Sequence, residues 1–327
     1  MRLVVYGPES RVAVEVGGGL FDAAGAAAAY RQPRGGGTTA EIPVGLAGLV
    51  EAGRPALELL RGVEEWVVAE RPDLVFAADA AQLRAPWPGR RIAAAGGNFA
   101  DHLASGMARR GRRMTAQEAR QMVRSDEPLG YWKLPSEAVG PGGVIRYPRW
   151  RDRLDYEGEV AIVIGPGGRD IPLEKAMRHV WGVTAFNDWS IRTPPKPGFF
   201  PFSLNLDKNF DGATSLGPAI AVDEVDPGDL HVSVRVNGEL RQSFSTRDMI
   251  YSFAEYVAFL SRDLTLLPGD IIVSGTGAGT VADTAEPGPD GSLPREKFLQ
   301  PGDVVEVDVP GIGALVNTIG PPAPPPE

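Results

Sequence analysis

The chain of 327 residues contains no cysteine, so it offers no disulfide, no thiolate nucleophile and no thiolate ligand for a metal. It has only three histidines, and any bound metal must therefore be held mainly by oxygen atoms. Basic residues are in the minority, with 33 Lys and Arg against 42 Asp and Glu, and the net charge is -9. That charge gives no general attraction to nucleic acid or to an anionic membrane, so we expect neither as a partner.

Long hydrophobic runs are also missing, because no apolar stretch reaches the length needed to span a bilayer. The N-terminal segment MRLVVYGPES breaks at a Gly-Pro turn before the apolar core of a signal peptide could form. We therefore expect a cytoplasmic protein. Hydrophobic residues still make up 43% of the chain, which is ample for the packed core of one large domain or two modest ones.

The first ninety residues have the pattern of a separate small α/β unit. Alternating apolar residues predict strands at 2–6 and 12–16, and a 3.6-residue period predicts a helix at 57–69. A Pro-rich segment at 85–88 interrupts regular structure before the next apolar run begins at Ile92. We therefore predict a small N-terminal domain at 1–90, a catalytic domain at 91–320, and a disordered Pro-rich tail at 321–327.

The second part of the chain reads as strand-dominated α+β. Pro-Gly-Asp turns begin at Pro227, Pro268 and Pro301, beside alternating β-branched runs. Asn237-Gly238 lies between two such runs and predicts a hairpin, because a type I′ turn needs positive φ at both central residues. Helices are expected at 173–179 and at 248–261, the second with Ser245 or Thr246 as its N-cap.

The run LDYEGEVAIVIG carries two carboxylates, Glu157 and Glu159, two residues apart on a predicted strand. Alternate side chains of a strand share a face, so the two acids stand about 6 to 7 Å apart at the backbone. Such alternation usually marks the wet face of an antiparallel strand. Like charges this close also repel unless a cation lies between them, which makes a metal site the alternative.

A third carboxylate, Asp188, follows a predicted buried strand at 181–186. Alone it could simply cap the next turn. Together with Glu157 and Glu159 it forms a set of hard oxygen ligands suited to Mg²⁺, with Mn²⁺ or Ca²⁺ as alternatives.

On these motifs the chain resembles the fumarylacetoacetate hydrolase family over the segment from Ile92 to Ile319. The matching residues are short pieces in a fixed order: Gly97-Asn98-Phe99-Ala100-Asp101-His102, the LDYEGEVAIVIG run, Phe186 to Arg192, Leu216-Gly217-Pro218, Val236-Asn237-Gly238-Glu239, Pro268-Gly269-Asp270, Ser274-Gly275-Thr276 and Pro301 to Val307. The resemblance implies a C-terminal mixed β-roll with the active site, a smaller N-terminal domain and a homodimer. It also implies that Glu157, Glu159 and Asp188 bind a divalent cation, typically Mg²⁺.

The resemblance further assigns roles to individual side chains. Lys208 matches the family lysine that helps to hold developing negative charge, and Arg192 matches one that faces the substrate acid. His102 lies in the segment that carries the family's catalytic histidine and is the candidate base. Lys133 and Thr276 are further candidates for substrate binding. Each of these residues could instead have an ordinary surface or structural role.

Two departures from the family pattern concern the reaction and the substrate. Hydrolytic members place a glutamate three residues after the histidine, where this chain has Ser105, and Glu118 or Asp126 could substitute for it. The segment 107–130, which contains both acids, is longer than usual and could form a lid or a solvated surface helix that begins with a capping box at Thr115. After Arg192, a Pro-rich loop at 193–200 replaces the usual substrate contacts.

Three functions are compatible with this pattern. The first is a Mg²⁺-dependent hydrolase that cleaves a carbon-carbon bond in an acylpyruvate or fumarylacetoacetate-like 2,4-diketo acid, through an enolate that the metal stabilises. The second is a dehydratase or related lyase of a 2-keto-3-deoxy sugar acid, which Ser105 favours because elimination need not use the same activated water. The third, a keto-acid binding protein without turnover, is opposed by the complete set of site residues.

Overall fold

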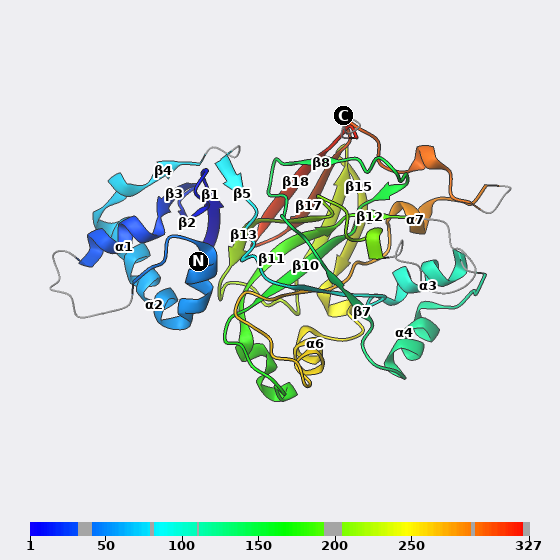
Figure 1. Ribbon diagram of the computed structural model, residues 1–327, viewed down its shortest axis with the longest axis horizontal. Coiled ribbons are helices and arrows are strands. Elements are labelled where there is room, and N and C mark those ends of the chain that lie inside the picture. Colours follow the sequence, from blue (N-terminus) through cyan, green and yellow to red (C-terminus); the bar gives the residue numbers. More distant parts are fainter. Residues whose placement is uncertain (32–40, 79–81, 110, 193–204, 289–291, 323–327) are drawn as a thin grey trace.

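The computed structural model describes residues 1–31, 41–78, 82–109, 111–192, 205–288 and 292–322. Within them the chain folds into a strand-rich α+β structure built on two large mixed sheets (Figure 1). The fold class expected from the sequence is therefore confirmed. The Gly-rich segment 35–37, the Pro-rich loop 193–200 and the end of the tail from residue 323 lie outside the described residues.

The larger sheet has eleven strands in the order β4-β3-β2-β1-β13-β11-β10-β16-β6-β7, with β5 paired to β1. All its neighbouring strands are antiparallel except β16 and β6, which run parallel. The strands are β1 (Arg2–Tyr6), β2 (Arg11–Val16), β3 (Gly19–Asp22), β4 (Phe76–Ala77), β5 (Leu83–Arg84), β6 (Ile92–Ala95), β7 (Gly130–Lys133), β10 (Gly158–Ile164), β11 (Val180–Asp188), β13 (Thr214–Ala221) and β16 (Ile271–Val273).

The second sheet has five strands in the order β15-β14-β17-β18-β8, and β9 and β12 form a separate pair. Its strands are β8 (Val144–Arg146), β14 (His231–Val236), β15 (Glu239–Ser245), β17 (Val304–Val309) and β18 (Gly313–Gly320); the pair is β9 (Leu154–Asp155) and β12 (Ser190–Ile191). The hairpin between β14 and β15 turns at Asn237 and Gly238, whose φ angles of 52° and 82° confirm the predicted turn.

The two sheets pack against each other through β10, whose side chains are all buried. Val160, Ile162 and Ile164 belong to the core shared with the five-stranded sheet. Ala161 and Val163 point the other way, into a second core that also contains residues of the N-terminal ninety. A strand buried on both faces has no wet side, so the wet-face interpretation of the Glu157 and Glu159 pattern is wrong.

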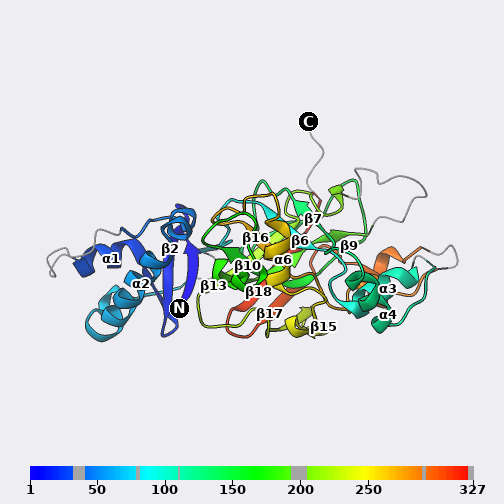
Figure 2. The ribbon, with the colours of Figure 1, turned by 90° about the horizontal axis from the view of Figure 1, so that it is seen from below.

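Most of the α-helices lie at the two ends of the molecule (Figures 1 and 2). With β1 to β4 at one end are α1 (Ala23–Arg31) and α2 (Leu46–Glu70), which contains the predicted helix at 57–69. At the other end α3 (Ala100–Arg109) lies beside both α4 (Ala116–Arg124) and α7 (Val281–Thr284). The remaining helical segments are α6 (Phe253–Leu260) and the 3₁₀ turns η2 (Pro72–Leu74), η4 (Leu173–His179), η5 (Thr246–Asp248) and η6 (Arg295–Lys297).

The predicted helix at 248–261 is wrong at its start. Ser245 caps only the 3₁₀ turn η5, and α6 begins after Ser252, whose hydroxyl forms a capping box with Glu255. The reason is a distant contact, because the backbone amides of residues 250 and 251 donate to the main-chain and side-chain oxygens of Asn98. Those amides therefore cannot enter a helix. The helix predicted at 173–179 is present over these residues as the 3₁₀ helix η4.

Candidate functional site

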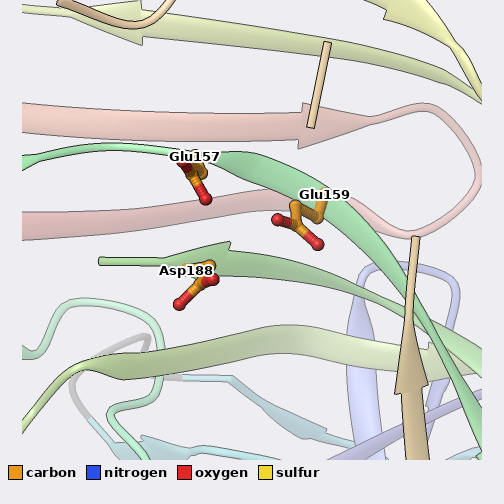
Figure 3. Close-up of side chains that lie close together, drawn as sticks. All are labelled: Glu157, Glu159 and Asp188. Carbon is orange, nitrogen blue, oxygen red and sulfur yellow. The ribbon is translucent and has the colours of Figure 1, made fainter. Parts of the chain in front are cut away.

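Three buried carboxylates meet where β10 and β11 lie side by side. Glu157 directly precedes β10, Glu159 is in it, and Asp188 ends β11 (Figure 3). One carboxylate oxygen of each lies within 4.8 Å of the others, and the residues are 5%, 1% and 0% exposed. The antiparallel pairing of Gly158 with Asn187 brings these acids from two strands to one place.

The backbone between the two glutamates is fixed by close packing and by two side chains. A Cβ on Gly158 would lie 2.3 Å from Cγ2 of Val234, so only glycine lets β10 approach the second sheet this closely. The Gly158 amide donates to Oε1 of Gln242 at 3.1 Å, and its carbonyl accepts from the Thr276 hydroxyl at 2.8 Å. The Thr276 hydroxyl, a candidate for substrate binding, thus also fixes the strand.

Basic side chains surround Glu157 and Asp188. The Lys208 ammonium bonds to Glu157, to Asp188 at 2.8 Å and to the Ser190 hydroxyl at 2.6 Å. The Lys133 ammonium is fully buried and donates to Asp188 and to the Lys208 carbonyl, and the Tyr131 hydroxyl also donates to Asp188. Lys133, the other candidate for substrate binding, is therefore buried against Asp188.

Arg192 has a double role in the site. Its Nη2 lies 2.6 Å from Glu157, and its Nε donates at 2.9 Å to Asp155, a fully buried acid in β9. Asp155 was not among the residues singled out from the sequence. It holds one edge of the guanidinium and directs the other edge to the carboxylate cluster.

The two glutamates have opposite electrostatic environments. Burial opposes ionisation of Glu157, but the charges of Lys208, Arg192 and His102 outweigh it and lower the pKa of that carboxyl. Burial raises the pKa of Glu159, and the neighbouring carboxylates Asp188 and Glu157 raise it further. Among the described residues no Lys or Arg forms an ion pair with Glu159, whose Oε2 accepts only from the Gly275 amide at 2.8 Å.

This arrangement fits a divalent cation. Three carboxylates supply hard oxygen ligands of the kind that Mg²⁺, Mn²⁺ and Ca²⁺ prefer. The repulsion that raises the pKa of Glu159 is the feature that a bound cation would relieve.

His102 lies in α3, at the edge of the carboxylate cluster. Its Nε2 is 3.9 Å from Oε1 of Glu157, and its side chain is 16% exposed. The motif residue Asn98 precedes α3 and fixes the start of this segment by donating to the carbonyls of Tyr251 and Ser274. The histidine is thereby directed at the acids from a separate part of the chain.

The carboxylate partner of His102 is Asp283, in α7. Oδ2 of Asp283 lies 2.8 Å from Nδ1 of the imidazole. Of the two substitutes considered from the sequence, Glu118 bonds to Thr115 in the predicted capping box, and Asp126 accepts from the Glu127 amide. The expectation that one of them replaces the missing glutamate is wrong.

No local pattern announces Asp283, which is 181 residues from His102 in the chain. The sequence Thr280-Val281-Ala282-Asp283 does have the spacing of a capping box, and the structure forms one. That signal predicts a helix start and says nothing of a histidine. Local patterns likewise do not predict the contacts of Gln242 with Gly158 and of Asp155 with Arg192.

The segment 107–130 contains the end of α3 and all of α4. Arg120 in α4 donates to the carbonyls of Asp248 and Met249, and Arg124 pairs with Glu255 of α6. Two arginines of α4 therefore contact the chain in and just before α6, and the action of the segment as a lid stays a prediction. No helix within the described ranges has the length and apolar character needed to cross a membrane.

Fold and site together define a protein with mixed sheets and a carboxylate cluster suited to a divalent metal. The family model described as fumarylacetoacetate (FAA) hydrolase C-terminal matches residues 91–320. The chain belongs to this family, as its motifs indicated.

Relatives of known name differ in reaction. The chain is 32% identical over 289 residues to the oxaloacetate tautomerase YisK of Bacillus subtilis, covering 85% of this chain and 87% of that protein. It is 28% identical to the solved fumarylacetoacetate hydrolase of Exiguobacterium antarcticum, with a TM-score of 0.71 and coverage of 98% and 99%. A solved 5-carboxymethyl-2-hydroxymuconate delta-isomerase of Mycobacterium smegmatis is 25% identical, with a TM-score of 0.63 and coverage of 98% and 100%.

Proposed function

We propose that the protein is a divalent-metal-dependent enzyme that catalyses keto-enol tautomerisation of a 2-oxo dicarboxylate of the oxaloacetate class. The observation that carries the proposal is an imidazole, His102, facing a buried cluster of three carboxylates from the edge of the site. The identity to an oxaloacetate tautomerase over most of both chains supports this choice of reaction.

The side chains have separate tasks in this reaction. A divalent cation held by Glu157, Glu159 and Asp188 would supply the positive charge that favours the enolate form of the substrate. Lys208 and Arg192 add positive charge beside the same carboxylates, where the anionic substrate would be oriented.

Proton transfer falls to His102. Its Nε2 takes a proton from the carbon next to the keto group, and a proton is then returned to the enolate oxygen. One C–H bond breaks and one O–H bond forms, so the reaction consumes no water and needs no further reactant. The reverse order of steps converts the enol to the keto acid.

A second candidate function is hydrolysis of an acylpyruvate, the reaction expected first from the sequence. His102 would then take a proton from water, and the hydroxide would add to the distal carbonyl. Cleavage of the carbon-carbon bond would release a free acid and the enolate of pyruvate, which would take the proton back from His102 to give pyruvate. The specific support is the 28% identity to a fumarylacetoacetate hydrolase along nearly the whole of both chains.

The dehydratase alternative was favoured because Ser105 leaves His102 without a carboxylate three residues further along the chain. Asp283 supplies a carboxylate from α7, so Ser105 no longer favours elimination. A binding protein without turnover is also less well supported, because the base and the carboxylates face each other.

Purified protein, with Mg²⁺ or Mn²⁺, should be offered enol oxaloacetate, a panel of acylpyruvates and a 2-keto-3-deoxy sugar acid, with products identified by NMR. Accelerated loss of enol absorbance that leaves keto oxaloacetate as the product would support tautomerisation. Pyruvate plus a free acid from an acylpyruvate would support the second candidate. A dehydrated keto acid, or no reaction with any of these compounds, would contradict both.

A further inference from the structure

The buried acid Asp155 holds one edge of the Arg192 guanidinium beside the carboxylate cluster. We infer that Asp155 is a positioning residue that fixes Arg192 so that its remaining N–H groups bind the second carboxylate of a 2-oxo dicarboxylate. Asp155 thereby sets the preference of the site for substrates with that acid group. The inference deepens the proposed function, because it rests on a substrate of the oxaloacetate class and on His102 as the base.

Asp155 is fully buried, and both of its carboxylate oxygens are engaged. Oδ2 accepts from Nε of Arg192 at 2.9 Å and from the Ala282 amide at 3.0 Å. Oδ1 accepts from the amides of Tyr156 and Val281, each at 3.0 Å. Backbone amides from two parts of the chain therefore fix the carboxylate, and the carboxylate in turn fixes the edge of the guanidinium.

Arg192 keeps donors that its contacts with the protein do not use. A guanidinium has five N–H groups, of which one on Nε goes to Asp155 and one on Nη2 goes to Glu157 at 2.6 Å. Within the described part of the chain, Nη1 has no hydrogen-bond partner. The side chain is 17% exposed, so an anion can reach it. Such donors match a carboxylate in geometry and charge.

Arg192 and the candidate base flank the same carboxylate oxygen. Oε1 of Glu157 is 2.6 Å from Nη2 of Arg192 and 3.9 Å from Nε2 of His102. In a substrate of the oxaloacetate class, the carbon that His102 deprotonates also carries the second carboxylate. That carboxylate must lie beside His102 during the reaction, on the side where Arg192 supplies positive charge.

Lys208 differs from Arg192 in the donors it has left. Its ammonium bonds to Oε2 of Glu157, to Asp188 and to the Ser190 hydroxyl, which accounts for all three of its N–H groups. Arg192 is thus better placed than Lys208 to take up a further acid group.

The test compares two ligands that differ only at the second acid group, since 2-oxobutanoate has a methyl group where oxaloacetate has that carboxylate. In Asp155→Asn one amide oxygen must replace two carboxylate oxygens that serve four donors, so the hold on Arg192 weakens. We expect KM for enol oxaloacetate to rise about tenfold or more, with kcat changed by less than about threefold. The inhibition constant of 2-oxobutanoate should change by less than about threefold. An equal loss for both ligands, or an unchanged KM, would overturn the inference.

Asp270→Asn is the matched control. Asp270 is also buried and also pairs with an arginine, Arg91, but it does not contact the carboxylate cluster. This variant should lower the thermal midpoint and leave both ligand constants unchanged. A rise in KM equal to that of Asp155→Asn would show that loss of a buried ion pair, and not the position of Arg192, weakens substrate binding.

Arg192→Gln tests whether Asp155 acts through the arginine. We expect Arg192→Gln alone to raise KM, and Asp155→Asn to add less than about threefold in that background. Effects that multiply would contradict the inference.

¹⁵N NMR of the arginine side chains tests the contact in the wild-type chain, and so does not depend on the folding of Asp155→Asn. An Arg192→Lys variant identifies the Nε–H signal of Arg192, which should exchange slowly with solvent because Asp155 accepts from it. Rapid exchange of that hydrogen would overturn the inference.

Failure of the inference is distinguishable from failure of the proposed function. If the protein does not tautomerise oxaloacetate, the proposed function and the inference that rests on it both fail. If oxaloacetate is turned over but Asp155→Asn leaves its KM unchanged, only the positioning role of Asp155 fails.

Discussion

At the scale of single residues, the three carboxylates of the cluster are not equivalent. Glu157 and Asp188 are each compensated by buried or half-buried cations, whereas Glu159 has only a backbone amide. An uncompensated buried charge destabilises a folded protein, and a divalent cation would remove that cost. Glu159 therefore couples metal affinity most directly to stability.

This difference predicts opposite effects of two isosteric substitutions on the metal-free protein. In EDTA, Glu159→Gln should raise the free energy of unfolding by about 1 kcal/mol, because it removes a repelled charge. Glu157→Gln should lower it by about 1–3 kcal/mol, because Lys208 and Arg192 lose their shared partner. Chemical denaturation measures both values, and two effects of the same sign would contradict the account.

Both substitutions should weaken Mn²⁺ binding at least about tenfold, measured by calorimetry, since each removes a charged ligand. The two variants are thus expected to change the free energy of unfolding in opposite directions but to lower Mn²⁺ affinity alike, so loss of a ligand can be distinguished from a change in stability. A variant with unchanged affinity would remove that residue from the proposed ligand set.

The sequence located the residues that lie next to a strong local signal. The structure brings six of the predicted side chains together at the carboxylate cluster: Glu157, Glu159, Asp188, His102, Lys208 and Arg192. Their roles in catalysis stay predictions. Asp283, Asp155 and Gln242 were missed because each acts on a partner far along the chain, and spacing within the chain cannot show such contacts. The hydroxyl of Thr276 and the ammonium of Lys133 already bond to the protein itself.

At the scale of elements, the site depends on how closely β10 approaches the second sheet. Gly158 lies between the two glutamates, and Val234 of β14 packs against it from that sheet. Strands and turns here follow local patterns, such as the Asn237-Gly238 hairpin, and were predictable. The start of α6 was not, because Asn98 holds the preceding backbone from another part of the chain.

Gly158→Ala should destabilise the protein by about 1–3 kcal/mol, because the new methyl group would overlap Cγ2 of Val234. Gly45→Ala is the matched control, since a Cβ there meets nothing within 4 Å and should change stability by less than about 1 kcal/mol. The free energy of unfolding measures both changes.

Val234→Ala in the Gly158→Ala background should recover part of the lost stability, because it removes the overlapping atom. A double-mutant cycle with no coupling between the two positions would show that the close approach of the sheets is not what requires glycine.

At the scale of the whole molecule, the N-terminal residues are joined to the rest through a continuous sheet. β1 pairs with β13 through Arg2 with Ala221 and Leu3 with Ile220. The core around Leu3 and Val14 also contains Phe186 and Ile220 from beyond residue 91. The division into domains at residue 90 stays a prediction. Because the two parts share this core, residues 91–327 alone would leave part of it uncovered.

A fragment of residues 91–327 should be less stable than the full chain, because it exposes the apolar side chains that the N-terminal residues cover. We expect aggregation on expression or a thermal midpoint lowered by about 10 °C or more. A soluble fragment with the midpoint of the full chain would show that the shared core contributes little.

The homodimer expected from the family resemblance is a separate prediction, which the sedimentation of the full chain would test.

The central claim is that proton transfer by His102 depends on a divalent cation at Glu157, Glu159 and Asp188. The most direct test follows the loss of enol absorbance of the substrate that the panel identifies, while Mn²⁺ is added to protein first treated with EDTA. The account predicts no acceleration in EDTA and recovery with Mn²⁺ that saturates at the stoichiometry of binding. Full acceleration in EDTA would contradict it.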